Sequence, residues 1–235
     1  MKNIPLKDRI ILALDVESPD KAKELVKQTE SHLGFYKVGL ELFMADWFGI
    51  VDWLVDRGHK VMLDLKFFDI PETVKRAVAR LNDHHITFAT IHGNDAIIRA
   101  ALEARGEMQL LAVTVLTSFG EDDLRAMGMT QSIEDLVYFR ARRALELGCD
   151  GVVCSGLEAG RLRQCLGEKL MLVTPGIRPG ANVMDQADDQ TRIMTAGRAL
   201  AAGADHVVVG RPISKASDPI AVIEAMQQEL AAAGR

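Results

Sequence analysis

The sequence predicts a single-domain α/β fold, a (β/α)8 barrel of the TIM-barrel type, and three observations lead to this prediction. Short runs rich in valine, isoleucine and leucine recur eight times along the 235 residues. Segments with helical spacing separate these runs, so predicted strands and helices alternate along the whole chain. The runs are continuously apolar, which is typical of parallel strands that helices cover on both faces.

The eight runs give the predicted strands in order. They comprise residues 9–16, 35–40, 60–67, 88–93, 110–116, 151–156, 170–177 and 206–212. The segments with helical spacing include residues 19–33, 71–85, 95–106 and 195–204, and most of them end at a glycine or a polar residue. Pro71 is typical of the first residue of a helix, which makes Ile70 the cap.

An open, doubly wound sheet is the alternative arrangement of the same elements. Such a sheet commonly carries G-x-G-x-x-G after its first strand, and the sequence has no such motif there. Neither a break in composition nor a flexible linker divides the chain. We therefore expect one barrel domain over residues 1–235, slightly compact for its class.

Composition and charge exclude several classes of function. The net charge is -5 and no Lys/Arg-rich run carries interleaved aromatics, which argues against a nucleic-acid partner but leaves room for a small anionic ligand. The three cysteines (Cys149, Cys154, Cys165) are odd in number and lack C-x-x-C spacing, which argues against a disulfide framework and a zinc site. The first apolar run is too short for a signal peptide and no segment is long enough for a membrane span, so we expect a cytoplasmic protein.

Polar residues end most of the predicted strands. In a (β/α)8 barrel the chemistry is built at these carboxyl ends. Each residue taken alone is typical of capping or of a solvated charge, but their recurrence at equivalent positions indicates a site. They are Asp15, Lys37, Asp64 with Lys66, His92, Thr117 with Ser118, Ser155, Arg178, and Gly210 with Arg211.

The stretch LDLKFFDIP, residues 63–71, places charges inside a predicted strand. Because side chains alternate between the faces of a strand, Asp64 and Lys66 are expected to project into one space. One interpretation is a structural ion pair that closes the barrel mouth. The other is a partly dry site in which Asp15 and Lys37 complete an alternating array and an ammonium donates a proton. Asp69 lies one place before the expected cap, so its side chain is expected to point elsewhere.

Six motifs in order resemble the orotidine 5'-phosphate decarboxylase family over nearly the whole chain. They are D-x-K-x-x-D-I-P at 64–71, KVG at 37–39, AVTVLTS at 112–118, VTPGIRP at 173–179, DQTRIMT at 189–195 and VGRPI at 209–213. The chain departs from many bacterial members at Phe68, Glu72 and Ala196, where those have His, Asn and Pro. No departure replaces a charged residue of the predicted array.

The resemblance implies decarboxylation of orotidine 5'-monophosphate to UMP and CO2 in de novo pyrimidine synthesis, without metal or organic cofactor. It implies that Lys66 is the general acid, that Asp64 orients it near the departing carboxylate, and that Lys37 extends the charge network. Asp69 would complete the site of the neighbouring subunit in a homodimer, which accounts for its position after the strand. The substrate contacts that the resemblance implies are Asp15, Thr73, Thr117, Ser118, Arg178, Gln190, Gly210 and Arg211.

The phosphate of the substrate is expected at the end of the eighth strand. Barrels often bind phosphate in the loops after strands seven and eight. The backbone of Gly210 can approach an anion closely, and Arg211 can hold it with two hydrogen bonds. The polar stretch 179–189 is long enough for a lid that closes over this end.

Two other functions remain as alternatives. A magnesium-dependent sugar-phosphate decarboxylase or aldolase of the same barrel group shares the D-x-K-x-x-D core, but the segments GIRP and DQTRIMT favour the nucleotide enzyme. A non-catalytic sensor of nucleotide phosphates is expected to have lost part of the charge array, whereas Asp64, Lys66 and Asp69 are all present.

Overall fold

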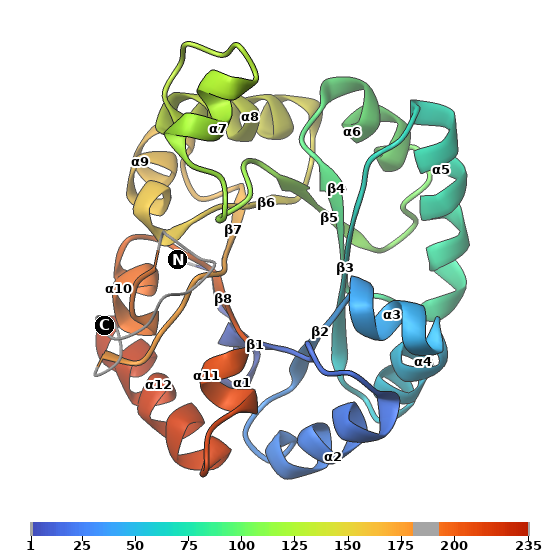
Figure 1. Ribbon diagram of the computed structural model, residues 1–235, viewed down its shortest axis with the longest axis vertical. Helices are drawn as coiled ribbons and strands as arrows, with labels where there is room; N and C mark the ends of the chain where they lie inside the picture. The colour runs from blue at the N-terminus through green and yellow to red at the C-terminus, as the bar shows by residue number, and fades with distance from the viewer. Residues whose placement is uncertain (1, 181–192, 235) are drawn as a thin grey trace.

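The computed structural model describes residues 2–180 and 193–234, and these form a closed barrel of eight parallel strands (Figure 1). The strands follow one another in sequence order, and β8 pairs with β1 to close the barrel. Their bounds are β1 Ile10–Ala13, β2 Phe35–Gly39, β3 Lys60–Phe67, β4 Phe88–His92, β5 Gln109–Val113, β6 Gly151–Val153, β7 Met171–Thr174 and β8 His206–Val209. The predicted (β/α)8 barrel is confirmed, and the open sheet is excluded.

Helices follow the strands and form the outer layer, except α1, which precedes β1. Their bounds are α1 Leu6–Arg9, α2 Pro19–Thr29, α3 Leu40–Asp46, α4 Gly49–Asp56, α5 Pro71–Arg80, α6 Asp95–Leu102, α7 Glu121–Ala126, α8 Ile133–Leu147, α9 Gly156–Leu166, α10 Ala196–Ala201, α11 Arg211–Ser214 and α12 Pro219–Ala233, with a 3-10 turn at Leu81–His84. Helix α5 begins at Pro71 with Ile70 as its cap, as predicted. It ends before the predicted boundary, because the chain turns into the 3-10 segment and then reaches His85 in the left-handed region (φ 48°).

The apolar core has two layers, and the alternation of side chains along each strand separates them. One layer lies between the strands and the helices. The other fills the barrel itself, and it consists of Ile11, Ala13, Phe35, Met62, Phe88, Leu111, Met171, Val173 and Val208, with Val153 partly buried against them. The inside of the barrel is therefore packed, and polar side chains gather only at its two ends.

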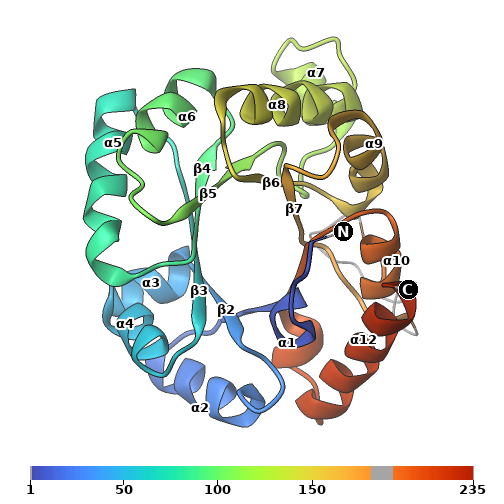
Figure 2. The same cartoon turned by 180° about the vertical axis from the view of Figure 1, so that it is seen from behind.

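The two ends of the barrel differ in what covers them. Helices α3 and α11, which directly follow β2 and β8, lie on the side facing the viewer in Figure 1, where the strands end. Figure 2 views the opposite end, where the N-terminal segment and α1 lie against the starts of the strands.

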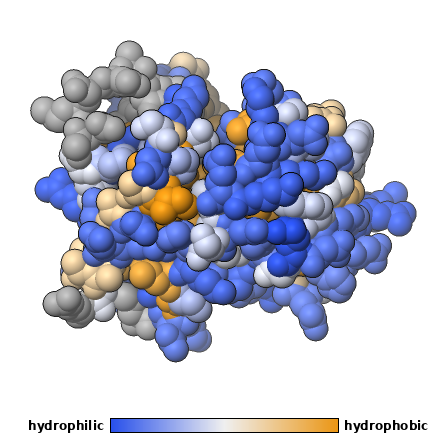
Figure 3. Space-filling view, turned by 90° about the horizontal axis from the view of Figure 1, so that it is seen from below, coloured by the Kyte–Doolittle hydropathy of each residue, from blue (hydrophilic) through white to orange (hydrophobic). Residues whose placement is uncertain are grey.

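The outer face shown in Figure 3 is mostly hydrophilic, with hydrophobic residues in small patches. Among the described residues no helix is both long and apolar enough to cross a membrane.

Candidate active site

Three charged side chains stand at the carboxyl ends of the first three strands, directly above the apolar interior. Each lies two positions beyond a residue that faces the inside of the barrel: Asp15 beyond Ala13, Lys37 beyond Phe35, and Asp64 beyond Met62. Because alternate residues of a strand share a face, the polar side chains continue the inward-facing rows. The interior packing thus brings together residues that are far apart in the sequence.

These residues and Lys66 form a chain of alternating charges. Lys37 Nζ lies 2.9 Å from Asp15 Oδ1 and 3.5 Å from Asp64 Oδ2, and Lys66 Nζ lies 3.0 Å from Asp64 Oδ1. Lys37 and Asp64 are buried, whereas the Asp15 side chain is 56% exposed and that of Lys66 is 35% exposed. The array therefore has a buried centre and two ends that a ligand can reach.

The two buried groups of this array, Lys37 and Asp64, are kept ionised by the charges around them. Burial alone would raise the pKa of Asp64, but the ammonium groups of Lys37 and Lys66 outweigh it and keep that pKa below its ordinary value. Burial alone would lower the pKa of Lys37, and the carboxylates of Asp64 and Asp15 reverse the effect, so this pKa is raised. The centre of the array consequently remains an ion pair at neutral pH.

Strand β3 is irregular where it carries Lys66, and simple alternation does not describe it. Leu63 pairs with Ala89 and Phe67 pairs with Ile91, so more residues lie on β3 than on β4 between these two pairs. Lys66 has a φ of 50°, a left-handed conformation that is uncommon outside glycine. Asp64 and Lys66 do share one space, as expected, but a bulge brings them together rather than the regular pleat.

Thr90 is a site residue that the sequence reasoning missed. It is fully buried in β4, its hydroxyl donates to Asp64 Oδ1 at 2.9 Å, and the backbone N–H of Lys66 donates to the same hydroxyl oxygen at 2.9 Å. A usable indication was present in the sequence. Thr90 is the polar residue between Phe88 and His92 in the same inward-facing row, level with Asp64.

Gly39, the glycine of the KVG motif, leaves space for the array. A Cβ atom at this position would lie 3.0 Å from Lys37 Nζ and 3.1 Å from Asp15 Oδ1. Any side chain would therefore press on the ion pair between these two residues.

Asp69 is not part of the array and lies in the connection between β3 and α5. Its Oδ1 accepts the backbone N–H of Ile70 at 2.6 Å, and no cation of residues 2–180 and 193–234 lies within ion-pairing distance of its carboxylate. A cavity of about 390 Å³ brings Asp69 together with Thr73 and Lys66. The remaining lining residues come from α3, from β3, from the connection after it and from α5, and all of them are apolar: Leu40, Phe43, Met44, Leu65, Phe67, Phe68, Val74 and Ala77.

The other predicted substrate contacts lie on loops at the carboxyl ends of the strands. Thr117 and Ser118 occupy a turn after β5, and Arg178 follows β7, where its Nη1 donates to the carbonyl of Ile177 at 3.0 Å. Gly210 precedes α11, and a Cβ on it would lie 3.7 Å from Asp15 Oδ2, so its backbone adjoins the array. Arg211 begins α11 and is exposed. Gln190 and most of the predicted lid at 179–189 lie outside the described residues.

A comparison with protein families identifies the chain. The model of the "Orotidine 5'-phosphate decarboxylase / HUMPS family" matches residues 8–226. The chain belongs to this family. The family recognised from the six sequence motifs is thereby confirmed.

Members of the decarboxylase family resemble the chain over nearly its full length. A protein of Methylococcus capsulatus named orotidine 5'-phosphate decarboxylase is 51% identical over 230 residues, covering 97% of this chain and 94% of its own. A protein of Rhodopseudomonas palustris with the same name is 49% identical over 229 residues, covering 97% and 96%. The crystal structure of orotidine 5'-phosphate decarboxylase from Lactobacillus acidophilus superposes with a TM-score of 0.82 at 34% identity, covering 95% of this chain and 99% of its own.

The departures from the decarboxylase family pattern fall around the array rather than in it. Phe68 is exposed and packs on His92, with the ring centroids 4.3 Å apart, and His92 in turn hydrogen-bonds Asn94. Glu72 pairs with Arg76 one turn along α5. Within the described residues, no three or more His, Cys, Asp and Glu side chains are placed to hold a metal ion.

Proposed function

We propose that this chain decarboxylates orotidine 5'-monophosphate to UMP and CO2, the last step of de novo pyrimidine synthesis. The observation that carries the proposal is the alternating array of Asp15, Lys37, Asp64 and Lys66 at the carboxyl end of the barrel. The family membership of the chain supports the same activity.

The array suits a reaction in which negative charge develops on carbon. When the bond between C6 and the carboxyl carbon breaks, CO2 leaves and the electron pair remains on C6, where the pyrimidine ring offers little resonance stabilisation. A fixed cation beside C6 stabilises this charge most in the transition state. Lys66 is placed for that role because Asp64 holds its ammonium and its side chain still reaches the open end of the array.

Lys66 then acts as the general acid. Its ammonium transfers a proton to C6, which gives UMP, and the neutral amine recovers a proton from water. The carboxylate of Asp64 orients the ammonium and lies near the departing carboxyl group of the substrate. Lys37 holds the second oxygen of Asp64, so the carboxylate remains ionised throughout.

The rest of the substrate is proposed to extend from this array to the end of β8. Asp15 and Lys37 contact the ribose, and Arg211 with the backbone of Gly210 binds the phosphate. The short distance from Gly210 to Asp15 supports a continuous path between these two parts. Thr73, Thr117, Ser118, Arg178 and Gln190 are proposed as further contacts. Binding energy from the remote phosphate lowers the barrier at C6 when it is realised in the transition state.

A homodimer with shared active sites is the proposed assembly. Apolar side chains that are more than half exposed lie on α3 and its carboxyl-terminal cap and on either side of Asp69 in the chain, and apolar patches on a surface mark interaction sites. They are Leu40, Met44, Trp47, Phe68 and Ile70. A two-fold dimer through this surface would carry Asp69 of each subunit to the site of the other.

The activity is tested by the loss of ultraviolet absorbance when the purified protein meets orotidine 5'-monophosphate. We expect turnover that EDTA leaves unchanged, since the proposed chemistry uses no metal. Metal-dependent activity on a sugar phosphate with no turnover of the nucleotide would instead identify the aldolase-like relative. Binding of UMP without any turnover would identify the sensor. We expect the enzyme to work in the cytoplasm.

The shared site is tested by mixing two inactive, folded variants, Asp64→Asn and Asp69→Asn. Random pairing makes about half of the dimers mixed, and each mixed dimer combines both lesions in one site while it leaves the other intact. About one quarter of all sites should therefore regain activity after dissociation and reassociation. If mixed dimers form and no activity returns, Asp69 serves its own chain.

A further inference from the structure

We propose that Thr90 is a positioning residue that holds both Asp64 and Lys66 in their working geometry. This inference rests on the proposed function, because it assigns a role within the same site. Thr90 does not reach the open end of the array, since its side chain is fully buried. It acts through the two residues that it binds.

The bulge in β3 leaves Lys66 without a regular partner in the sheet. Leu63 is opposite Ala89 and Phe67 is opposite Ile91, so Thr90 is the residue of β4 that faces the irregular stretch. The N–H of Lys66 donates to the hydroxyl oxygen of Thr90 at 2.9 Å. The hydroxyl oxygen of Thr90 thus replaces the backbone acceptor that a regular ladder would supply, and the partly buried N–H of Lys66 does not remain unpaired.

The direction of both hydrogen bonds follows from the chemistry of the groups. A backbone amide can only donate, so the hydroxyl oxygen of Thr90 is the acceptor for Lys66. An ionised carboxylate can only accept, so the hydroxyl proton points to Asp64 Oδ1, 2.9 Å away. One hydroxyl therefore connects the backbone of the lysine to the carboxylate that holds its ammonium.

The connection determines how Asp64 is rotated. Its Oδ1 accepts the hydroxyl proton of Thr90 and pairs with the ammonium of Lys66. Its Oδ2 is then the oxygen that faces Lys37, with Lys37 Nζ 3.5 Å away. Lys66 itself has a φ of 50°, and such a conformation persists only where the surroundings enforce it. Packing alone does not explain why residue 90 is a threonine, because valine has nearly the same shape and would fill the same volume. The hydroxyl group is what distinguishes the two side chains.

Three variants test the role of the hydroxyl. Thr90→Val removes it at constant shape, and Thr90→Ser retains it. Thr29→Val is the matched control, because Thr29 is also fully buried but its hydroxyl donates to the carbonyl of Leu25 within α2, away from the site. For each variant, kcat and KM for orotidine 5'-monophosphate are measured together with urea unfolding, so that only folded protein is compared.

We expect Thr90→Val to lower kcat about 10- to 100-fold, since small misplacement of a reacting group has effects of this size. KM should change less than about threefold, because Thr90 does not touch the substrate. Thr90→Ser should recover most of kcat, and Thr29→Val should match the wild type. Wild-type kcat in Thr90→Val, or equal losses in Thr90→Val and Thr90→Ser, would overturn the inference while the proposed function stands. An inactive wild-type protein would overturn both.

Discussion

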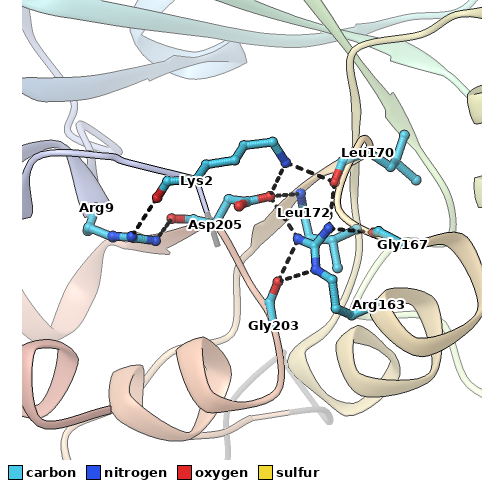
Figure 4. Close-up of polar contacts among 8 residues, drawn as sticks. All are labelled: Lys2, Arg9, Arg163, Gly167, Leu170, Leu172, Gly203 and Asp205. Atoms are coloured by element: carbon cyan, nitrogen blue, oxygen red, sulfur yellow. Dashed lines mark hydrogen bonds and ion pairs between the residues drawn. The ribbon is translucent and has the colours of Figure 1, made fainter. Parts of the chain in front are cut away.

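Each end of the barrel buries an aspartate among cations, and the two clusters differ in what else their cations bind. At the amino-terminal end, Asp205 Oδ2 accepts from Lys2 Nζ, from Arg163 Nη2 and from the backbone N–H of Leu172, each at 2.9 Å (Figure 4). At the carboxyl-terminal end, Asp64 accepts from Thr90 and pairs with Lys37 and Lys66.

The cations of the amino-terminal cluster are also bound to backbone carbonyls. Arg163 donates to the carbonyls of Gly203, Gly167 and Leu170, and Lys2 Nζ donates to Leu170 at 3.2 Å. Arg9 joins the cluster by donating to the carbonyls of Asp205 and Lys2. These contacts tie the N-terminal segment to the starts of β7 and β8.

The lysines of the carboxyl-terminal array contact carboxylates instead, and one of them reaches solvent. Lys66 pairs with Asp64 while its side chain remains 35% exposed, and Lys37 lies between two carboxylates. Similar charged residues therefore have different roles at the two ends of the barrel. An aspartate whose cations are also held by the backbone stabilises the fold, and an array with an accessible ammonium is available for chemistry.

Replacing Lys66 should give the largest effect. Lys66→Ala removes the proposed cation beside C6, which is also the proposed proton donor, so kcat should fall by about 10⁴-fold or more, while substrate binding weakens far less. Steady-state kinetics and UMP binding measure the two effects separately. Near-normal turnover would remove Lys66 from the acid role and make the two ends of the barrel alike.

Replacing Asp205 should affect stability rather than activity. Asp205→Ala leaves Arg163 and Lys2 without their buried carboxylate, and the free energy of unfolding should fall by about 3–5 kcal/mol. Urea unfolding measures the loss, and kcat and KM of the folded variant should equal those of the wild type. Asp205→Asn is a milder variant if the alanine protein fails to fold.

The control for Asp205 is Lys21→Ala, which breaks an exposed pair with Glu17. It should change the unfolding curve little, because exposed pairs are screened by water. A loss of kcat in folded Asp205→Ala would contradict the division between a structural end and a reactive end.

His206, at the amino-terminal end of the barrel interior, should make stability depend on pH. Its ring packs edge-on against Phe35 and Phe88, its Nδ1 hydrogen-bonds the carbonyl of Asp8 at 2.8 Å, and burial lowers its pKa from 6.5 to about 4. Between pH 6.5 and pH 4, the imidazole of His206 therefore binds a proton more readily in the unfolded chain than in the folded protein. The contribution of the neutral imidazole is therefore fully present above pH 6.5 and is lost as the pH falls toward 4.

The loss should amount to as much as about 3 kcal/mol across this interval. Urea unfolding between pH 7 and pH 4 measures it, with His206→Leu as the comparison. The difference in unfolding free energy between the two proteins should change with pH. A constant difference would show that the imidazole does not contribute to acid unfolding.

Arg211 should have the smallest effect, and we expect to see it in KM. Arg211→Ala removes the proposed charge-assisted contact to the phosphate, so KM should rise about 10- to 100-fold. Turnover of the phosphate-free nucleoside should change little, because the partner of Arg211 is then absent. Equal losses on both substrates would make Arg211 a structural residue, like Arg163 at the other end.

Local sequence patterns were sufficient to predict most of the architecture. All eight strands lie within the predicted runs or within one residue of them, because apolarity, turn residues and the spacing of helices are properties of short segments. The start of α5 at Pro71, with Ile70 as the cap, was predicted from the backbone preferences of proline alone. The rule that a barrel builds its chemistry at the carboxyl ends of the strands also predicted that Asp15, Lys37 and Asp64 belong to one site.

The tertiary structure decided what depends on a neighbouring strand or on the far end of the chain. Lys66 adopts its left-handed conformation at a bulge that the sequence of β3 does not predict. There its N–H donates to Thr90 on the neighbouring strand, which also binds Asp64, 26 residues away in the sequence. Asp205 becomes structural because Lys2, 203 residues away, reaches it when the barrel closes. The sequence by itself determined the strands, their inward-facing rows and the family motifs. Only the closed barrel decided which buried charges are fully satisfied and which remain accessible, because hydrogen bonding and burial depend on every segment that surrounds a group.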